Sequence, residues 1–146
     1  ALNQRFVALR GRGATRNNEP LSPETRSSVT SGCISLCSRS IRVLQRKPDQ
    51  PFPGKIRLFG VASLDLVSVA LGQTVAALEA TPKLWDLAAA WLVLDELGCP
   101  IRWLESDPAQ LPSGQDVSQL GFPMLAASSW SQLARVLPWG EELVRS

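Results

Sequence analysis

Apolar and polar residues alternate along this chain in short segments whose lengths are typical of strands followed by helices. Runs of β-compatible residues predict strands at 4–9, 33–38, 55–59, 74–78, 100–104 and 123–127. Apolar residues at helical spacing predict helices over 40–47, 62–71, 81–97 and 129–144, the last interrupted near Pro138. This succession of elements favours an α/β fold with a largely buried sheet.

Several helix boundaries are marked by residues with strong positional preferences. Gly72 and Gly98 follow apolar segments, and we expect each to end a helix. Thr81 and Pro82 suit the N-cap and the first position of the helix over 81–97. That helix is apolar on nearly every side, so we expect it to lie between two layers of the fold.

The composition is that of a globular protein and excludes several kinds of chemistry. The 146 residues amount to one ordinary domain or a piece of a larger one, and 45% of them are apolar. There is no histidine, which excludes Ser-His-Asp triads, Cys-His pairs and histidine-ligated metals within the chain. No apolar segment approaches the ~20 residues of a membrane span, so we expect no membrane partner.

Cysteine usage indicates a reducing compartment. Cys33, Cys37 and Cys99 are odd in number and lack Cys-x-x-Cys spacing, which argues against a disulfide framework and against a zinc site. We interpret them as small, half-buried residues and predict a cytoplasmic protein.

Positive charge is concentrated in the first part of the chain. Residues 1–57 hold eleven Lys and Arg against three Asp and Glu, whereas residues 58–146 hold four against ten. Such asymmetry is typical of a nucleic-acid-binding arm, of a solvated basic face, or of the rim of a site for anionic substrates. The arginines nearest the start are Arg5, Arg10, Arg12 and Arg16. A single aromatic residue, Phe6, lies among them, so we do not expect nucleic acid to be the partner.

Two carboxylates stand at positions where α/β proteins hold ligands, and each has two readings. Asp86 lies near the start of the helix predicted over 81–97, where free backbone N–H groups and the helix dipole stabilise a negative charge. It is either a helix-start acid or a metal ligand, and magnesium would need further oxygens besides it. Glu79 ends a predicted strand and is either an ordinary strand-end acid or a ligand-binding group.

The region from residue 57 to residue 98 follows a recognisable pattern: Arg, two residues, Gly, a small pair, an apolar helix ending in Gly, a strand, an acid, then Trp-Asp-hydrophobic-Ala-Ala. The matching residues are Arg57, Gly60, Ala62-Ser63, Gly72, Ala76, Glu79, Trp85-Asp86 and Ala88-Ala89. This pattern closely resembles the C-terminal half of the inositol monophosphatase family. Residues 7–21, VALRGRGATRNNEPL, are similar to that family's Ala-x-x-Gly-x-Gly-Ala-x-x-Asn hairpin and precede the pattern in the correct order.

The resemblance implies an αβαβα layered fold and a Mg²⁺-dependent, lithium-sensitive phosphomonoesterase. Its substrate would be an inositol phosphate or a related sugar or nucleotide phosphate. The resemblance also implies that Asp86 is a ligand of a catalytic magnesium ion and that Glu79 contacts substrate hydroxyls. Gly60, Val61 and Ala62 would line the substrate pocket. In such enzymes metals polarise the phosphoryl group and help to generate a hydroxide-like nucleophile.

The chain also departs from the family. The Glu-Glu and Asp-Pro-(Ile/Leu)-Asp-Gly-Thr motifs, which carry the family's main metal carboxylates, do not occur before Arg57, so no catalytic residue can be assigned. Glu141 and Glu142, which follow Gly140, are also two consecutive glutamates, but they lie near the other end of the chain, and we interpret them as part of a solvated helix face. We therefore expect a C-terminal portion of such an enzyme, with 1–21 a hairpin remnant of the preceding sheet and 30–146 the C-terminal α/β subdomain. Val61 stands where Ser or Thr is frequent, which leaves the substrate open.

Three hypotheses follow from the sequence. The first is a metal-dependent phosphatase whose C-terminal part is inactive alone; the second is a non-catalytic half-domain that binds an anionic partner. The third and weakest is an RNA-associated protein. Because the absent half would cover apolar surface, we expect the isolated chain to self-associate, for example as a homodimer, or to be poorly soluble.

Overall fold

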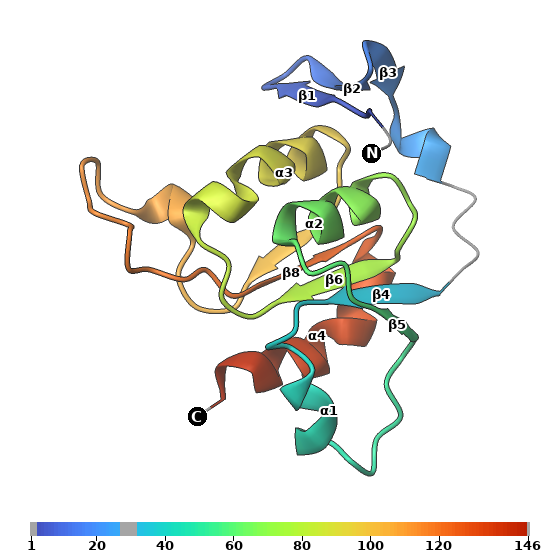
Figure 1. Ribbon diagram of the computed structural model, residues 1–146, viewed down its shortest axis with the longest axis vertical. Helices are drawn as coiled ribbons and strands as arrows, with labels where there is room; N and C mark the ends of the chain where they lie inside the picture. Colours follow the sequence, from blue (N-terminus) through green and yellow to red (C-terminus); the bar gives the residue numbers. More distant parts are fainter. Residues whose placement is uncertain (1–2, 27–31, 146) are drawn as a thin grey trace.

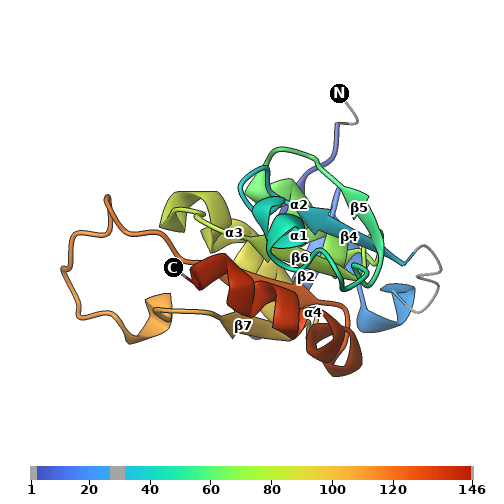
Figure 2. The same ribbon diagram turned by 90° about the horizontal axis from the view of Figure 1, so that it is seen from below.

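The computed structural model describes residues 3–26 and 32–145, and its elements lie in four layers (Figure 1). The first layer is an antiparallel sheet of β1 (Phe6–Leu9), β2 (Gly13–Arg16) and β3 (Glu19–Leu21). The second holds helices α2 (Ala62–Ala70) and α3 (Leu84–Glu96). The third is a sheet in the order β5 (Lys55–Arg57), β4 (Cys33–Leu36), β6 (Ala76–Glu79), β8 (Met124–Ala127), β7 (Ile101–Trp103). The fourth holds α1 (Arg42–Arg46) and α4 (Trp130–Val144), which Figure 2 shows on the lower face.

Two single-turn 3₁₀ helices complete the fold. One is Pro23–Arg26, after β3; the other is Pro108–Gln110, in the polar segment between β7 and β8, which extends away from the body of the molecule (Figure 1). No helix among the described residues is both long and apolar enough to span a membrane.

Strand direction places three strand ends at one edge of the larger sheet. Strands β4, β5 and β6 are parallel, whereas β8 runs antiparallel to both of its neighbours, β6 and β7. Helices α2 and α3 begin on the side where β4 and β6 end (Figure 1). Parallel strands with this connectivity create a crevice at their carboxyl ends, where α/β proteins bind ligands.

The central strands β4, β6 and β8 are fully buried because helices cover both faces of the sheet. One apolar cluster, with Leu66, Leu87 and Leu94, packs α2 and α3 against the sheet. The other, with Ile34 and Trp139, packs α1 and α4 against the opposite face. Burial on both faces explains why the sequence of these strands is continuously apolar rather than alternating.

Three sequence expectations for the helices are corrected by the structure. Helix α3 begins at Leu84 rather than at Thr81, because the carboxylate of Asp86 accepts the Lys83 backbone N–H (2.9 Å) and fixes the helix start there. Helix α4 continues through Pro138 instead of being interrupted there. Proline has no N–H to donate to the carbonyl of Ala134, one turn earlier. Both residues are exposed, so water can satisfy that carbonyl.

The third correction concerns Glu142, which we expected on a solvated face. Glu141 is exposed, but Glu142 is buried and forms ion pairs with Arg145 (2.8 Å) and Lys47 (3.6 Å). These two cations offset the cost of burying the Glu142 charge.

Helix α3 lies between the two sheets, yet part of its outer face is exposed. Trp85 is 64% exposed, and Leu64 on α2 is 52% exposed. Between β1 and these two helices runs an apolar groove of about 450 Å³, lined by Phe6, Val7, Ala8, Ser63, Leu64, Val67, Ala88, Ala89, Ala90, Leu92 and Val93. The small sheet therefore covers α3 incompletely.

The β1–β2 turn is anchored to the end of α3 by one side chain. Both carboxylate oxygens of Glu96 accept backbone N–H groups, from Gly11 (2.7 Å) and from Gly13 (2.8 Å). Both glycines have positive φ (72° and 79°), a backbone conformation that β-carbon sterics disfavour in other residues. The Gly-x-Gly spacing thus shapes a turn that presents two N–H groups to one carboxylate.

We expect Glu96→Gln to loosen this turn, because an amide oxygen can accept one of the two N–H groups but its nitrogen repels the other. Hydrogen exchange at the Gly11 and Gly13 amides should accelerate, while exchange in β6 and β8 stays unchanged. Unaltered protection of both glycines would contradict the anchoring role.

Candidate functional site

A cavity of about 330 Å³ opens at the carboxyl edge of the parallel strands. It is lined by Cys37, Ser38, Arg39, Gly60, Val61, Ala62, Ser63, Glu79, Thr81, Pro82 and Asp86. All five residues that the sequence singled out (Gly60, Val61, Ala62, Glu79 and Asp86) lie in this wall. The structure therefore brings together, at one cavity, residues from three separate segments of the chain.

The start of α2 forms one wall. Gly60 has a positive φ of 77°, which turns the chain after β5, and the extended residue Val61 then leads into the helix. Residues 60–63 consequently face the cavity through backbone and small side chains. Their location fits the pocket-lining role that the sequence predicted for Gly60, Val61 and Ala62.

Asp86 forms part of the opposite wall, in the first turn of α3. Its side chain is exposed, and one of its oxygens caps the helix by accepting the Lys83 N–H (2.9 Å). The helix-start interpretation of Asp86 is thus correct. It does not compete with a ligand role, because a carboxylate has lone pairs for several partners and this one also lines the cavity.

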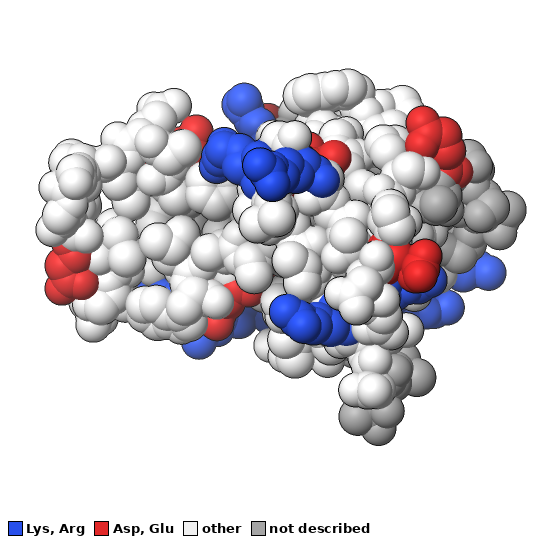
Figure 3. Space-filling model, turned by 90° about the horizontal axis from the view of Figure 1, so that it is seen from above, with Lys and Arg blue, Asp and Glu red and all other residues white. Residues whose placement is uncertain are grey.

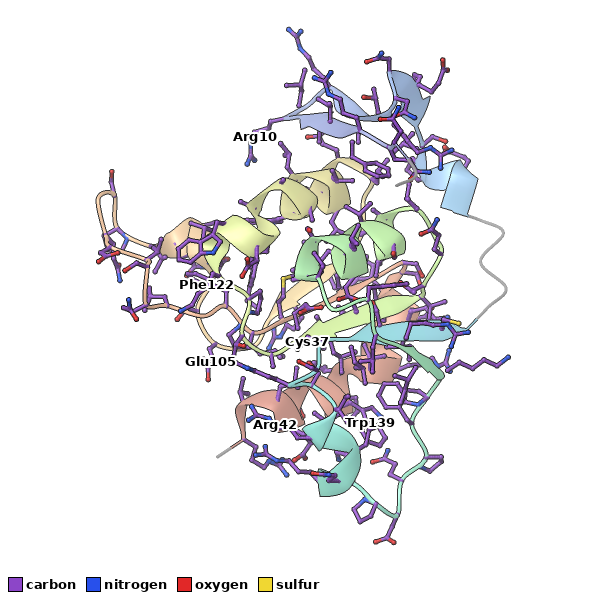
Figure 4. All side chains as sticks on the ribbon, viewed as in Figure 1. Arg10, Cys37, Arg42, Glu105, Phe122 and Trp139 are labelled. Atoms are coloured by element: carbon purple, nitrogen blue, oxygen red, sulfur yellow. The ribbon has the colours of Figure 1, made fainter. Side chains whose placement is uncertain are left out.

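Residues after β4 were not identified from the sequence as part of the site. The Ser40 hydroxyl donates to the Leu78 carbonyl (2.8 Å), which ties this loop to the end of β6. Cys37 lies at the same junction (Figure 4), where its Sγ is 2.9 Å from Ser40 Oγ and accepts the Ala80 N–H (3.4 Å). Arg39 donates to the Thr81 hydroxyl (2.9 Å) and supplies a positive charge to the cavity wall.

The most unusual feature of the site is a pair of buried carboxyl groups, Asp65 of α2 and Glu79 of β6. Asp65 is fully buried and Glu79 is 2% exposed. The two side chains hydrogen-bond to each other, and Glu79 also reaches the cavity wall. Neither Asp65 oxygen, nor Oε1 of Glu79, receives a well-aligned hydrogen bond from an N–H or hydroxyl group of the described residues.

Burial controls the ionisation of this pair. It raises the pKa of Asp65 to about 6, although the neighbouring Glu79, Ser35 and the Phe59 backbone oppose that rise. Burial, with the charges of Cys37 and Asp65, raises the pKa of Glu79 to about 9. At neutral pH Glu79 therefore holds a proton and donates it to the Asp65 carboxylate, so the pair carries one negative charge.

Asp65 was missed in the sequence because it sits among apolar residues of the 62–71 segment and its partner is distant along the chain. An acid in the first turn of an otherwise apolar helix, shortly after a glycine turn, was the available signal.

The described residues do not form a metal site by themselves. No three His, Cys, Asp or Glu side chains in the described part of the chain lie close enough together to hold a metal ion. Magnesium requires about six oxygen ligands, whereas the cavity offers the exposed carboxylate of Asp86 and a protonated Glu79. The predicted Mg²⁺ would therefore need ligands from outside residues 3–26 and 32–145.

The basic residues near the start of the chain do not belong to this cavity. Figure 3, which views the molecule from the side of the small sheet, shows Lys and Arg side chains in several separate groups with Asp and Glu among them. Arg5, Arg10, Arg12 and Arg16 are exposed, and none of them lines the cavity. Their exposure to solvent is typical of a solvated basic face, and that interpretation of the basic region stays a prediction.

Comparison with known proteins identifies the relatives of this chain. The sequence model of the inositol monophosphatase family matches residues 1–132. No curated protein gives a significant match. Among solved structures, the chain is similar to an IMPase/NADP phosphatase complexed with NADP and Ca²⁺, with 24% identity and a TM-score of 0.66 over 92% of this chain and 50% of that one.

Two further structures have the same fold. Inositol monophosphatase II from Staphylococcus aureus is 20% identical, with a TM-score of 0.71 over 99% of this chain and 56% of its own. A hypothetical protein from Pyrococcus horikoshii with similarities to inositol-1 monophosphatase is 17% identical, with a TM-score of 0.70 over 94% and 52%. The chain thus spans about half the length of the structures that it matches.

The carboxyl pair should make stability fall as pH rises. Both pKa values are raised above the unfolded values, so the folded state binds more protons and loses stability between pH ~4 and ~9. Urea unfolding should show that the free energy of unfolding falls by more than about 1 kcal/mol between pH 5 and pH 8.5, since one pKa unit corresponds to ~1.4 kcal/mol.

In Glu79→Gln the free energy of unfolding should depend less steeply on pH. Glu141→Gln, which removes an exposed acid, should retain the original slope; parallel profiles for all three proteins would contradict the pairing.

Proposed function

This chain belongs to the inositol monophosphatase family, and we propose that it supplies the alcohol-binding part of a phosphomonoesterase active site. One observation carries the proposal: Gly60, Val61, Ala62, Glu79 and Asp86, which match the family pattern in sequence, line a single cavity. They come from the ends of strands and the starts of helices, where α/β enzymes bind substrates.

The residues that line the cavity differ in chemistry, and each group has a different role in the proposal. The backbone and small side chains of residues 60–63 leave space for a ring or chain of carbon atoms. Glu79 faces that space with a carboxyl group that can hydrogen-bond hydroxyls. Asp86, exposed at the start of α3, would be one oxygen ligand of a Mg²⁺ ion that polarises the phosphoryl group, with its other ligands outside the described residues.

The substrate in this proposal is a phosphate ester of a polyhydroxylated alcohol. Solved relatives are described as bound to D-inositol-1-phosphate and to NADP, both of which join a phosphate to a hydroxyl-bearing ring. A cavity of about 330 Å³ with a carboxyl group in its wall suits such a ring. Val61, half exposed beside the cavity, is the residue at which we expect substrate preference to differ from that of relatives.

The remaining half of the active site would come from polypeptide that precedes this chain. The solved relatives are about twice as long, and the apolar groove along β1, α2 and α3 is the surface that such a segment would cover. Residues 1–21 would then be part of a larger sheet. Cys33, Cys37 and Cys99 form no disulfide among the described residues, which supports the cytoplasmic location that we propose.

In the complete protein, Asp86→Asn should lower phosphatase turnover and magnesium affinity by at least about 10–100-fold. The asparagine oxygen can still accept the Lys83 N–H, so the melting temperature should change little. Asp95→Asn, on the same helix but outside the cavity wall, is the matched control and should leave both quantities unchanged. Near-normal turnover in the Asp86 variant would refute the ligand assignment.

Residues 1–146 alone should show no Mg²⁺-dependent release of phosphate from inositol monophosphate. Too few ligands are present, and the exposed groove should promote self-association, which sedimentation velocity would detect. Phosphate release that Asp86→Ala abolishes in this isolated chain would contradict the prediction. Tight binding of an anionic partner without catalysis would instead favour a non-catalytic half-domain.

A further inference from the structure

The buried pair Asp65–Glu79 has no evident structural purpose. Neither carboxylate forms an ion pair among the described residues, where the ion pairs found involve Glu142. Burying two acids without a cation costs stability that apolar side chains of similar size would avoid. The pair also lies at the functional site, because Glu79 reaches the cavity wall while Asp65 lies fully buried behind it.

The geometry leaves Glu79 dependent on Asp65. Its Oε1 is buried without an N–H or hydroxyl donor in the described structure, and the Asp65 side chain is one hydrogen-bonding neighbour. The Cys37 thiol also lies near Glu79, but its own hydrogen-bonding contacts are with Ser40 and the Ala80 N–H. Asp65 is therefore the neighbour that can fix the Glu79 carboxyl group from its buried side. Without Asp65 that contact is lost, and the carboxyl group can rotate.

We infer that Asp65 is a positioning residue which, from its buried place behind the cavity wall, holds the Glu79 carboxyl group in place to bind hydroxyl groups of the substrate. The inference rests on the proposed function and adds to it the residue that sets the preference for a polyhydroxylated alcohol. The proton that Glu79 holds at neutral pH stays between the two carboxyl groups when substrate binds. Binding therefore changes hydrogen bonds only and breaks no covalent bond.

The charge of the pair gives this arrangement selectivity. One shared proton leaves a single negative charge, which repels a phosphate group but accepts hydrogen bonds from neutral hydroxyls. The pair therefore directs the alcohol end of a substrate toward Glu79 and the phosphate end away from it. The other charged groups that line the cavity are Arg39 and Asp86.

The test compares two substrates in the complete protein. Inositol 1-phosphate has hydroxyl groups for Glu79, whereas p-nitrophenyl phosphate has none. In Asp65→Leu, which fills the space without a hydrogen-bonding group, kcat/KM for inositol 1-phosphate should fall about tenfold or more, mainly through KM, because a positioned hydrogen bond is lost. The value for p-nitrophenyl phosphate should stay within about twofold.

Two variants control the comparison. Asp65→Asn should recover most of the inositol 1-phosphate activity, because its amide can donate to Glu79 and hold it. Thr74→Val removes another buried oxygen, one for which the described residues supply no hydrogen bond and which does not line the cavity, and it should leave the substrate ratio unchanged. If Asp65→Leu fails to fold, the same substrate ratio is measured in Asp65→Ala.

Equal losses for both substrates, or an unchanged ratio in a folded Asp65 variant, would overturn the inference. Failure of the proposed function gives a different result from failure of this inference, because in that case Asp86→Asn would leave turnover unaffected.

Equilibrium dialysis of radiolabelled myo-inositol against the 146-residue chain is a second test, which needs neither metal nor turnover. Binding that weakens in Asp65→Leu but persists in Asp86→Asn supports the inference, and binding unchanged in Asp65→Leu contradicts it.

Discussion

The site depends on one hydrogen bond between two acids that the fold has removed from water. Asp65 and Glu79 come from different elements, and their burial is possible because one shared proton cancels half of their charge. Burying the two acids lowers the free energy of unfolding of the whole domain, and such groups with shifted pKa values are common at functional sites. In return, an acid at the end of β6 is held in a fixed position at the cavity wall.

The surrounding architecture supplies the conditions for that pair. Helices cover both faces of the larger sheet, which removes its central strands from water. The parallel direction of β4, β5 and β6 then brings the loop after β4, the start of α2 and the end of β6 to one edge. Each of these three chain segments continues directly from a strand of the sheet, so the sheet rather than a loop alone sets its position.

Most of this architecture could be predicted from the sequence, because helices and buried strands leave local patterns. Five residues that line the cavity could be singled out because a family pattern fixes their spacing, while the roles assigned to them stay predictions. The start of α3 was misplaced, since Thr81 and Pro82 satisfy the local rules for a helix start but the Asp86–Lys83 hydrogen bond decides it. Asp65 could not be connected with Glu79, because their contact depends on how α2 packs on β6, which no local pattern encodes.

The most direct test of this account is a ¹³C NMR titration of the side-chain carboxyl carbons of Glu79 and Asp65, assigned with the Glu79→Gln and Asp65→Asn variants. The shared proton predicts that the Glu79 signal remains that of a protonated acid at pH 7.5 and titrates near pH 9. The Asp65 signal should titrate near pH 6. Two carboxyl groups that both ionise near pH 4, independently of each other, would contradict the account.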